Sequence, residues 1–479
     1  MVGQKGSVAR SAKGLLPGTV TNVKFILYSQ FNEEVIQSHL GEPGYSYYFI
    51  LKAFQHVLAD LGTVQVVRQP ELEVDAIFED CRARGEPCVF LPFAPAGKIP
   101  LDLKCPTVPV VAWEFSTFPD ASLDEGSRNE WRVALAKLGR AIALSRYSAR
   151  VIAEAMDRDF QISAVPPPLP ARKIDDPTKE SASIGLDIES GETTLDTAVM
   201  NLQADLLAPA TRPANVASGA IEESPLATGR HFPEFTSARE TRVRLDAASV
   251  VYTAVLNPND RTKNVSDLVT GFCWAFREIP DATLVLKVGH PSWQSFSTRL
   301  TPILHQLSPF KCRVCVIPGF LPAIEYEKLI RATTYYVNTS SAEGVCLPLM
   351  EFMSCGKPAI APAHTAMSDY VDHDVAFLLR ASRQITSWPN DPLERLCTMS
   401  FRLDWESLRE AYRQSYELAR INPAGYREMS ERARERMREY ASPASITEQL
   451  RRFFAPNAVS SAGPSHGRHS ATEQVAGRG

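Results

Sequence analysis

The residues of this sequence best suited to chemistry are two glutamates eight positions apart, Glu343 and Glu351. Pro348 suits the first position of a helix and Gly356 suits the residue just past its end, so the sequence predicts a short helix over 348–355. The loop before this helix then lies at a helix N-terminus, where free backbone N–H groups hold phosphate or sugar oxygens. Ionised carboxylates only accept hydrogen bonds, so beside such an anion site they suit the hydroxyls of a sugar and of a ribose.

A regular alternation of apolar runs and amphipathic stretches predicts the elements that position these carboxylates. In the first half we expect strands at 23–31, 63–67, 86–93, 107–116 and 141–145, and helices at 45–62, 129–139 and 146–156. In the second half we expect strands at 248–257, 282–289, 312–317, 335–340 and 358–363, and helices at 265–278, 291–307, 325–332, 348–355 and within 404–454. Near-continuous apolar strands separated by helices are typical of a parallel sheet covered on both faces. The predicted fold class is therefore α/β, with two tandem Rossmann-like domains.

The composition changes abruptly between the two halves. Between residues 175 and 227 there is no aromatic residue, and ten acidic residues face two basic ones. Such a stretch buries too little apolar surface to offset the entropy of ordering it, so we interpret 171–246 as an acidic insertion or linker. We expect that deleting 175–227 leaves folding and donor binding intact. Around it we expect a flexible leader (1–22), an N-terminal domain (23–170), a C-terminal domain (247–440), a helix that returns to the N-terminal domain (441–456) and a disordered tail (457–479).

Composition and charge exclude several classes of protein. With 479 residues, of which 44% are hydrophobic and 22% charged, the chain has the composition of a globular protein of more than one domain. Its net charge of −4 gives no global attraction to nucleic acid. Nine scattered cysteines, mostly in apolar runs, are typical of a reducing cytosol. No apolar run is long enough to span a membrane, so we expect a cytoplasmic protein, with peripheral attachment to the inner face of the membrane left open.

Two Rossmann-like domains in tandem face a central cleft, which is where open α/β folds bind ligands. Neither G-x-G-x-x-G nor G-x-x-x-x-G-K-[ST] occurs, which removes two common modes of nucleotide binding. The class of ligand therefore depends on the loops at the cleft. The most informative loop opens the segment EGVCLPLMEFMSCGKPAIA (343–361).

This segment resembles the E-x7-E motif of the retaining glycosyltransferases of family 4, which have the GT-B fold and usually carry EGFGLPxxEAMACGxPVIA. By that resemblance Glu343 contacts the hydroxyls of the donor sugar and Glu351 those of the ribose. The backbone that holds the sugar and the diphosphate would be that of Gly344, Val345, Cys346 and Leu347. The second glycine of the family motif is Cys346 in this sequence, and we expect its side chain to take up room near the bound sugar.

The turn before helix 265–278 is similar to the R-x4-K or R-K-N loop of the same family, whose two cations neutralise the leaving diphosphate. Here the cations are Arg261 and Lys263, at a second helix N-terminus that we expect Asn264 to cap. A guanidinium binds two phosphate oxygens at once, whereas an ammonium acts as a point charge. The spacing is shortened to R-x-K, which leaves open which cation carries more of the charge. A solvated basic turn is the alternative.

Three further positions follow from the resemblance. Gly44 lies in the loop 41–45, where family members bring glycine close to the donor phosphates and the acceptor. Glu114 ends a strand near the place of a polar cleft residue in many relatives, and we expect it to position the acceptor. The turn where relatives hold the nucleobase through backbone groups contains Gly319, Phe320 and Leu321.

Together these features predict a retaining, metal-independent glycosyltransferase of GT-B fold. It would move a hexose from a nucleotide sugar, bound by the C-terminal domain, to a polysaccharide, oligosaccharide or lipid-linked acceptor on the N-terminal side. We expect no metal, no cofactor and no nucleic acid partner. Two alternatives stay open: a nucleotide-sugar epimerase of the same fold, and a non-catalytic scaffold whose acidic insertion binds a partner.

Overall fold

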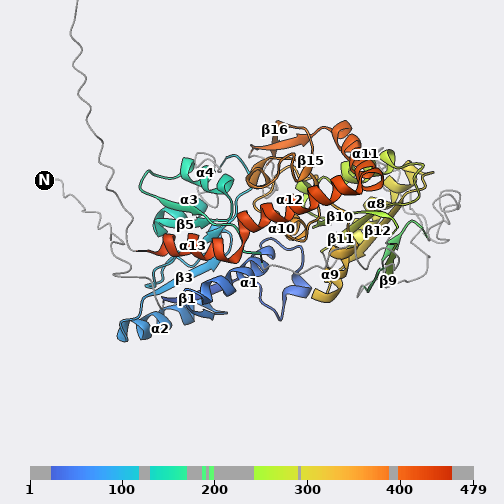
Figure 1. Ribbon diagram of the computed structural model, residues 1–479. Coiled ribbons are helices and arrows are strands. Elements are labelled where there is room, and N and C mark those ends of the chain that lie inside the picture. Colours follow the sequence, from blue (N-terminus) through green and yellow to red (C-terminus); the bar gives the residue numbers. More distant parts are fainter. Residues whose placement is uncertain are drawn as a thin grey trace, which may run out of the picture.

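Two sheets of mainly parallel strands form the framework of the computed structural model of this chain (Figure 1). The structure describes residues 23–117, 130–169, 186–189, 194–198, 242–246, 248–289, 293–387 and 397–455. The first sheet has six parallel strands in the order β2-β1-β3-β4-β5-β6. The second has seven strands in the order β15-β14-β13-β10-β11-β12-β8, of which only β8 is antiparallel to its neighbour. The predicted α/β fold with parallel sheets is confirmed.

Strands and helices alternate through the N-terminal domain. Its elements are β1 (Val23–Ser29), η1 (Ile36–His39), α1 (Ser46–Ala59), β2 (Gly62–Val66), α2 (Pro70–Ala83), β3 (Cys88–Phe93), η2 (Ala96–Lys98), β4 (Val110–Val111), α3 (Glu130–Leu138), β5 (Arg140–Ala143), α4 (Arg146–Ala155) and β6 (Gln161–Ala164). Phe25, Ile26 and Leu27 of β1 are fully buried at consecutive positions. This continuous burial is what a parallel strand covered on both faces requires.

The C-terminal domain repeats the alternation. Its elements are β10 (Val250–Leu256), η4 (Arg261–Lys263), α7 (Val265–Ala275), β11 (Ala282–Val288), α8 (Trp293–Leu307), β12 (Arg313–Pro318), α9 (Ala323–Ala332), β13 (Tyr335–Val337), α10 (Leu347–Ser354), β14 (Ala359–Ala361), η5 (Thr365–Asp369), β15 (Ala376–Leu378), β16 (Ala381–Ser387), β17 (Cys397–Leu403) and α11 (Trp405–Ile421). The strands β10, β11 and β12 supply buried side chains to two clusters, one on each face of the sheet.

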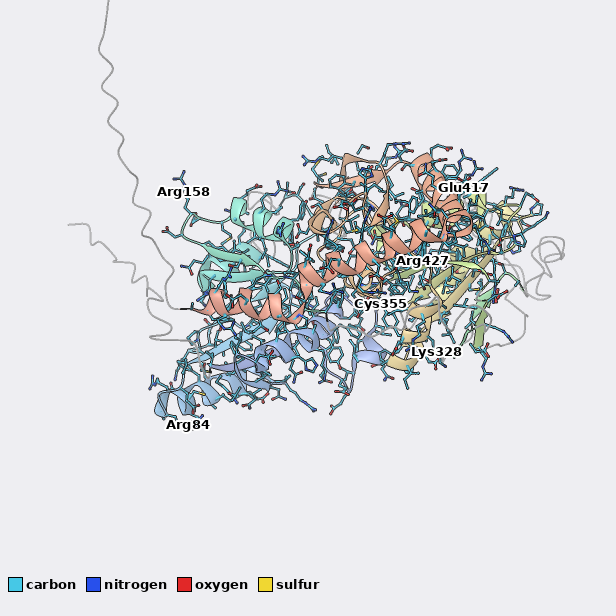
Figure 2. The ribbon with its side chains drawn as sticks, viewed as in Figure 1. Arg84, Arg158, Lys328, Cys355, Glu417 and Arg427 are labelled. Carbon is cyan, nitrogen blue, oxygen red and sulfur yellow. The ribbon has the colours of Figure 1, made fainter. Side chains whose placement is uncertain are left out.

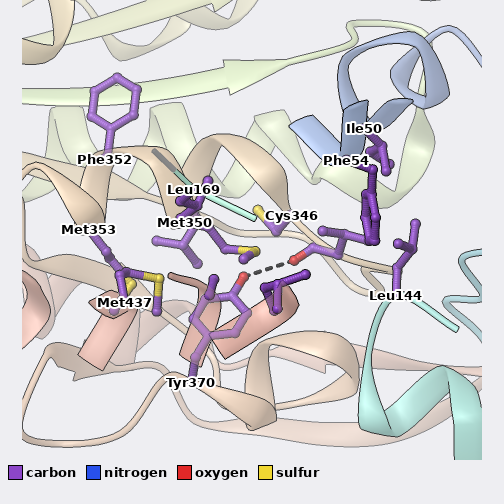
Figure 3. Packing of buried hydrophobic residues seen from close by; sticks show 14 of the residues in the cluster. Ile50, Phe54, Leu144, Leu169, Cys346, Met350, Phe352, Met353, Tyr370 and Met437 are labelled. Atoms are coloured by element: carbon purple, nitrogen blue, oxygen red, sulfur yellow. Dashed lines mark hydrogen bonds between the residues drawn. The ribbon is translucent and has the colours of Figure 1, made fainter. Parts of the chain in front are cut away.

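The last two helices, α12 (Pro423–Ala441) and α13 (Pro443–Phe454), carry the chain back to the N-terminal domain. The ring of Phe454 packs 5.4 Å from that of Phe25 on β1, and Arg140 donates to the Phe453 carbonyl at 3.0 Å. One apolar cluster consequently includes residues of both domains, and Figure 3 shows its part behind α10. Among the helices of the described residues, none is long and apolar enough to cross a membrane.

The elements that were not expected from the sequence include α2, β6, β15 and the two strands of the β16–β17 hairpin. Helix α2 buries only Pro70, Val74 and Cys81, so its apolar stripe is narrow. The expected strand 107–116 is confined to β4 (Val110–Val111), and the chain after it contacts the C-terminal domain at Gly344.

The acidic segment 171–246 differs from its interpretation as a linker. Three of its pieces form short strands on the C-terminal domain: β7 (Leu186–Glu189), β8 (Leu195–Asp196) and β9 (Arg242–Leu245). Ile188 and Leu195 are buried in the two large apolar clusters. Lys328, labelled in Figure 2, donates to the Asp187 carbonyl at 3.5 Å.

The linker interpretation is wrong for these residues. The average composition of the segment is acidic, and it concealed the few apolar side chains that pack against the C-terminal domain. Deleting 175–227 would remove both β7 and β8, so the expectation of a harmless deletion falls with it. The rest of the predicted insertion lies outside the described residues, as do the predicted leader (1–22) and tail (457–479).

Asp196 anchors β8 to the edge of the C-terminal sheet. Its carboxylate accepts from the Arg313 guanidinium on β12, with Nε to Oδ1 at 3.0 Å and Nη2 to Oδ2 at 2.5 Å. Arg313 also donates to the Arg244 carbonyl of β9 at 2.7 Å. The Asp196 side chain is 8% exposed, so this pair is shielded from water.

Replacing Asp196 with alanine is expected to destabilise the C-terminal domain by about 3 kcal/mol, because it leaves a mostly buried guanidinium without its carboxylate. The measurement is the midpoint of urea unfolding. Asp187→Ala, which removes an exposed carboxylate from β7, is the control and should leave the midpoint unchanged. Equal midpoints for both variants would mean that β8 adds nothing to the domain.

Candidate active site

Helix α10 begins and ends as the sequence predicts, within one residue of 348–355. Pro348 lies in its first turn, where a missing N–H costs nothing. Gly356 follows the last turn with φ of 73°, a left-handed conformation that suits glycine. The loop Glu343–Cys346 therefore lies at a helix N-terminus, and this prediction is confirmed.

Glu343 is buried in the floor of this loop, with 7% of the residue exposed. Its Oε1 accepts three hydrogen bonds: from Lys263 Nζ at 2.7 Å, from Ser340 Oγ at 2.6 Å and from Asn338 Nδ2 at 3.2 Å. The carboxylate is therefore ionically paired and held in one orientation. Sequence reasoning had assigned Glu343 and Lys263 to different parts of a donor, and the structure brings them into direct contact.

Lys263 is held between two carboxylates, since its Nζ also lies 3.5 Å from Asp260 Oδ2. Burial by itself would lower the pKa of Lys263, but the charges of Glu343 and Asp260 outweigh burial and raise that pKa well above its usual value. Burial would likewise raise the pKa of Asp260, yet Lys263 and the Thr262 donors lower it. Both groups are consequently charged at neutral pH.

Arg261 opens the 3-10 turn η4, and its side chain is exposed. The two cations therefore differ in setting: Lys263 is packed into the site and Arg261 stands at its surface. Asn264 does not cap α7 in the expected way. It has φ of 49°, and its Nδ2 donates to Asp267 Oδ2 at 2.9 Å, so its side-chain oxygen does not accept from the helix.

Glu351 lies on α10, one turn and a half beyond the loop. Its Oε2 accepts from the Tyr326 hydroxyl of α9 at 2.9 Å. The side chain is half-buried, so it is both oriented by the protein and within reach of solvent. Tyr326 was not identified from the sequence, because a tyrosine in an amphipathic helix carries no signal of such a contact.

Cys346, which stands at the second glycine of the family motif, has φ of 59°. This left-handed conformation costs a residue with a Cβ about 1 kcal/mol or more. Its Sγ accepts from Asn338 Nδ2 at 3.0 Å and lies near Met350 in the core behind the loop (Figure 3). Asn338 thus joins Cys346 to Glu343, while the expected contact between Cys346 and a bound sugar stays a prediction.

Glu114 of the N-terminal domain lies beside this loop. A Cβ at position 344 would lie 3.0 Å from Ala112 Cβ and 3.5 Å from Glu114 Oε2, so the two domains approach closely here and a side chain would press on Ala112. Burial, followed by the charge of Asp260, raises the pKa of Glu114 to about 7. The structure therefore brings Glu114 to the Glu343 loop.

The loop 41–45 of the N-terminal domain contacts the C-terminal domain beside β10. Asn257, just after β10, donates to the Gly41 carbonyl at 2.7 Å and joins the two domains. Gly44 itself faces Pro95 and Gln30 of its own domain. Burial raises the pKa of the neighbouring Tyr45, and the charges of Lys263, Asp260 and Glu343 act on its hydroxyl. Tyr45, which the sequence analysis missed, is thus the residue of this loop on which the charge of Lys263 acts.

The turn Gly319–Leu321 follows β12 at the cleft. Phe320 packs against an apolar cluster of the N-terminal domain that includes Phe31 and Leu40, and Leu321 is buried. The ammonium of Lys287, a buried residue of β11, donates to the Gly319 carbonyl. Lys287 was missed because a single lysine in an apolar strand gives no indication of what it contacts.

No group of three or more histidine, cysteine, aspartate or glutamate side chains that could hold a metal ion occurs in the described part of the chain. The chemistry that this geometry supports is recognition of an anion and of hydroxyl groups. Lys263 and Glu343 are paired at the N-terminus of α10, and Glu114 of the N-terminal domain lies beside the same loop.

Comparison with solved structures identifies the fold. HepE from Anabaena, in complex with UDP and glucose, is similar with a TM-score of 0.51 at 13% identity, over 90% of this chain and 98% of HepE. Sucrose-phosphate synthase from Thermosynechococcus elongatus matches with the same TM-score, identity and coverage. The chain therefore has the GT-B fold of these glycosyltransferases, as predicted. No family model and no curated protein matches the sequence.

Proposed function

We propose that this protein is a nucleotide-sugar-dependent glycosyltransferase that retains the configuration of the transferred hexose and needs no metal ion. The observation that carries the proposal is the cluster of Lys263, Glu343 and Glu114 at the N-terminus of α10. The GT-B fold supports it, and HepE, which shares that fold, is known in complex with UDP-glucose. The proposed acceptor is a glycan or a lipid-linked sugar on the N-terminal side of the cleft.

In the proposed reaction the bond between the hexose C1 and the diphosphate breaks, and the acceptor hydroxyl bonds to C1 from the same face. The hydroxyl proton passes to the departing phosphate oxygen. Arg261 and Lys263 stabilise the charge that develops on the diphosphate. The backbone N–H groups of Gly344–Leu347 hold the sugar and phosphate oxygens.

The remaining carboxylates divide the hydroxyl groups between them. Glu343 accepts from the hexose hydroxyls, and Glu351 accepts from the ribose. Glu114 accepts from the acceptor hydroxyl and holds it near C1, which aligns the two reacting groups. The turn Gly319–Leu321 supplies backbone groups to the nucleobase.

Thermal-shift measurements with UDP, GDP and ADP test the proposal most directly. A ligand at 100 times its Kd stabilises the protein by about 2.7 kcal/mol, and we expect one of the three diphosphates to do so. A transferase then releases that nucleoside diphosphate from its nucleotide sugar only when an acceptor is added. With an epimerase, adding an acceptor should cause no release of nucleoside diphosphate. A scaffold should bind none of the three diphosphates.

Replacing Glu351 with alanine is expected to weaken binding of the preferred nucleoside diphosphate by about 1 to 3 kcal/mol, because the ribose hydroxyls lose a charged acceptor. Isothermal titration calorimetry measures the loss. The sharper comparison uses the 2′-deoxy nucleotide, which the wild type should bind more weakly and Glu351→Ala should not distinguish. Glu327→Ala, which removes a glutamate from the adjacent helix α9, is the control. Full discrimination in Glu351→Ala would remove this residue from the ribose site.

A further inference from the structure

The β16–β17 hairpin is an element that neither the motifs nor the proposed chemistry explains. Its strands pair in antiparallel register over seven residue pairs, from Ala381 with Leu403 to Ser387 with Cys397. In Figure 1 it extends from the upper edge of the C-terminal domain, on the side of α4. Alternate residues of a strand lie on opposite faces, so Thr398 and Ser400 share one face of β17 and Phe401 lies on the other.

Phe401 contacts the loop that carries Glu343. Its backbone N–H donates to the Ser341 carbonyl at 2.9 Å, and its ring stacks on that of His364 at 4.2 Å with an interplanar angle of 11°. The N–H of Ser341 in turn donates to the Thr262 carbonyl at 2.7 Å, beside Lys263. One end of β17 is therefore bound to the donor side of the cleft.

Thr398 contacts the opposite domain. Its hydroxyl lies 2.9 Å from that of Thr117, in hydrogen-bond contact, and Thr117 follows Glu114 by three residues. Thr398 and Ser400 are each only 3% exposed, so this face of the hairpin is packed rather than solvated. Phe401 of β17 thus binds the loop that carries Glu343, and Thr398 of the same strand binds the loop of the other domain that carries Glu114.

We propose that the β16–β17 hairpin is a positioning element that holds the Glu114 loop (112–117) against the Glu343 loop (340–343). Thr398 and Phe401 are its positioning residues, and they fix the acceptor side of the cleft relative to the donor side. The assignment of one loop to the donor and the other to the acceptor rests on the proposed function. The coupling between the two loops does not depend on that assignment. A rigid strand is suited to this task because neighbouring positions on it cannot move independently.

Hydrogen exchange of the backbone amides tests the coupling. Thr398→Val removes the hydroxyl and keeps the shape of the side chain. We expect the amides of 112–117, in the other domain, to exchange about 3- to 10-fold faster, because one neutral hydrogen bond that closes this contact is lost. Thr398→Ser, which keeps a hydroxyl, should restore slow exchange. Thr298→Val, on the exposed surface of α8, is the matched control and should change neither loop.

A second variant addresses the donor side. Phe401→Leu should speed exchange both in 340–343 and in 112–117, whereas a purely local role would affect only the hairpin and 340–343. Unchanged exchange of 112–117 in both Thr398→Val and Phe401→Leu would overturn the proposal. Failure of the wild type to bind UDP, GDP or ADP would instead refute the proposed function and leave the exchange result standing.

Discussion

Replacing Arg261 with alanine is expected to lower kcat by about 100-fold or more while KM for the donor rises much less. A group that stabilises charge developing on the diphosphate acts in the transition state, so its loss appears in the chemical step. Because the Arg261 side chain is exposed, its removal should leave the melting temperature unchanged. Steady-state kinetics with the preferred nucleotide sugar and its acceptor measures both constants.

Lys263→Ala is expected to give a similar loss of kcat together with a loss of stability. It leaves the Glu343 carboxylate, whose side chain is 9% exposed, without its cation, and breaking such a pair costs about 3 kcal/mol or more. Lys311→Ala, which breaks an exposed pair with Glu278, is the control. Near-normal turnover in both Arg261→Ala and Lys263→Ala would contradict the proposal that these two cations stabilise the diphosphate. Loss of wild-type activity in EDTA would contradict the proposal that no metal ion is needed.

The second large effect is expected at Glu114. Because its pKa is raised to about 7, this carboxyl is mostly protonated at pH 6 and mostly ionised at pH 8. Only the ionised form accepts the hydrogen bond of an acceptor hydroxyl on both oxygens, so kcat/KM for the acceptor should rise with pH through about 7 and then level off. Glu114→Gln should abolish this rise and lower the plateau about 10- to 100-fold, since a charged acceptor is lost.

The pH profile of kcat/KM for the acceptor is the measurement, and Glu42→Gln, which removes an exposed carboxylate from the loop 41–45, is its control. Binding of the nucleoside diphosphate should stay within about twofold of wild type in Glu114→Gln. An unaltered pH profile in Glu114→Gln would assign the acceptor contact to another group.

Local signals explain what the sequence predicts correctly. Pro348, Gly356 and the two glutamates lie within one short segment, so the helix and the position of its N-terminal loop follow from neighbouring residues. The alternation of apolar strands and helices predicts the α/β fold for the same reason. Short apolar runs that are bounded by turn residues and separated by amphipathic stretches favour buried parallel strands.

Long-range contacts explain what it does not predict. The pair Lys263–Glu343 joins residues 80 positions apart, and nothing near either residue indicates it. Glu114 meets Gly344 only because the two domains approach each other. The strand β8 was concealed by its acidic surroundings, although Leu195 and Asp196 each have a specific partner surface in the second domain.

The Lys263–Glu343 pair also bears on which anions the cleft rejects. The charge of Lys263 is already balanced by Glu343 and by the nearby Asp260, so an entering anion meets a lysine whose counter-ions are in place. Inorganic phosphate or pyrophosphate can replace Glu343 as the counter-ion of Lys263. It supplies no sugar hydroxyls to replace Lys263 as a donor to Glu343. Under the proposed function a sugar diphosphate would replace both partners at once, with phosphate oxygens for Lys263 and hydroxyl protons for Glu343. Ser340 and Asn338 would still donate to Glu343, but a buried carboxylate that loses its cation is destabilised, so under the proposed function the pair would discriminate against simple anions.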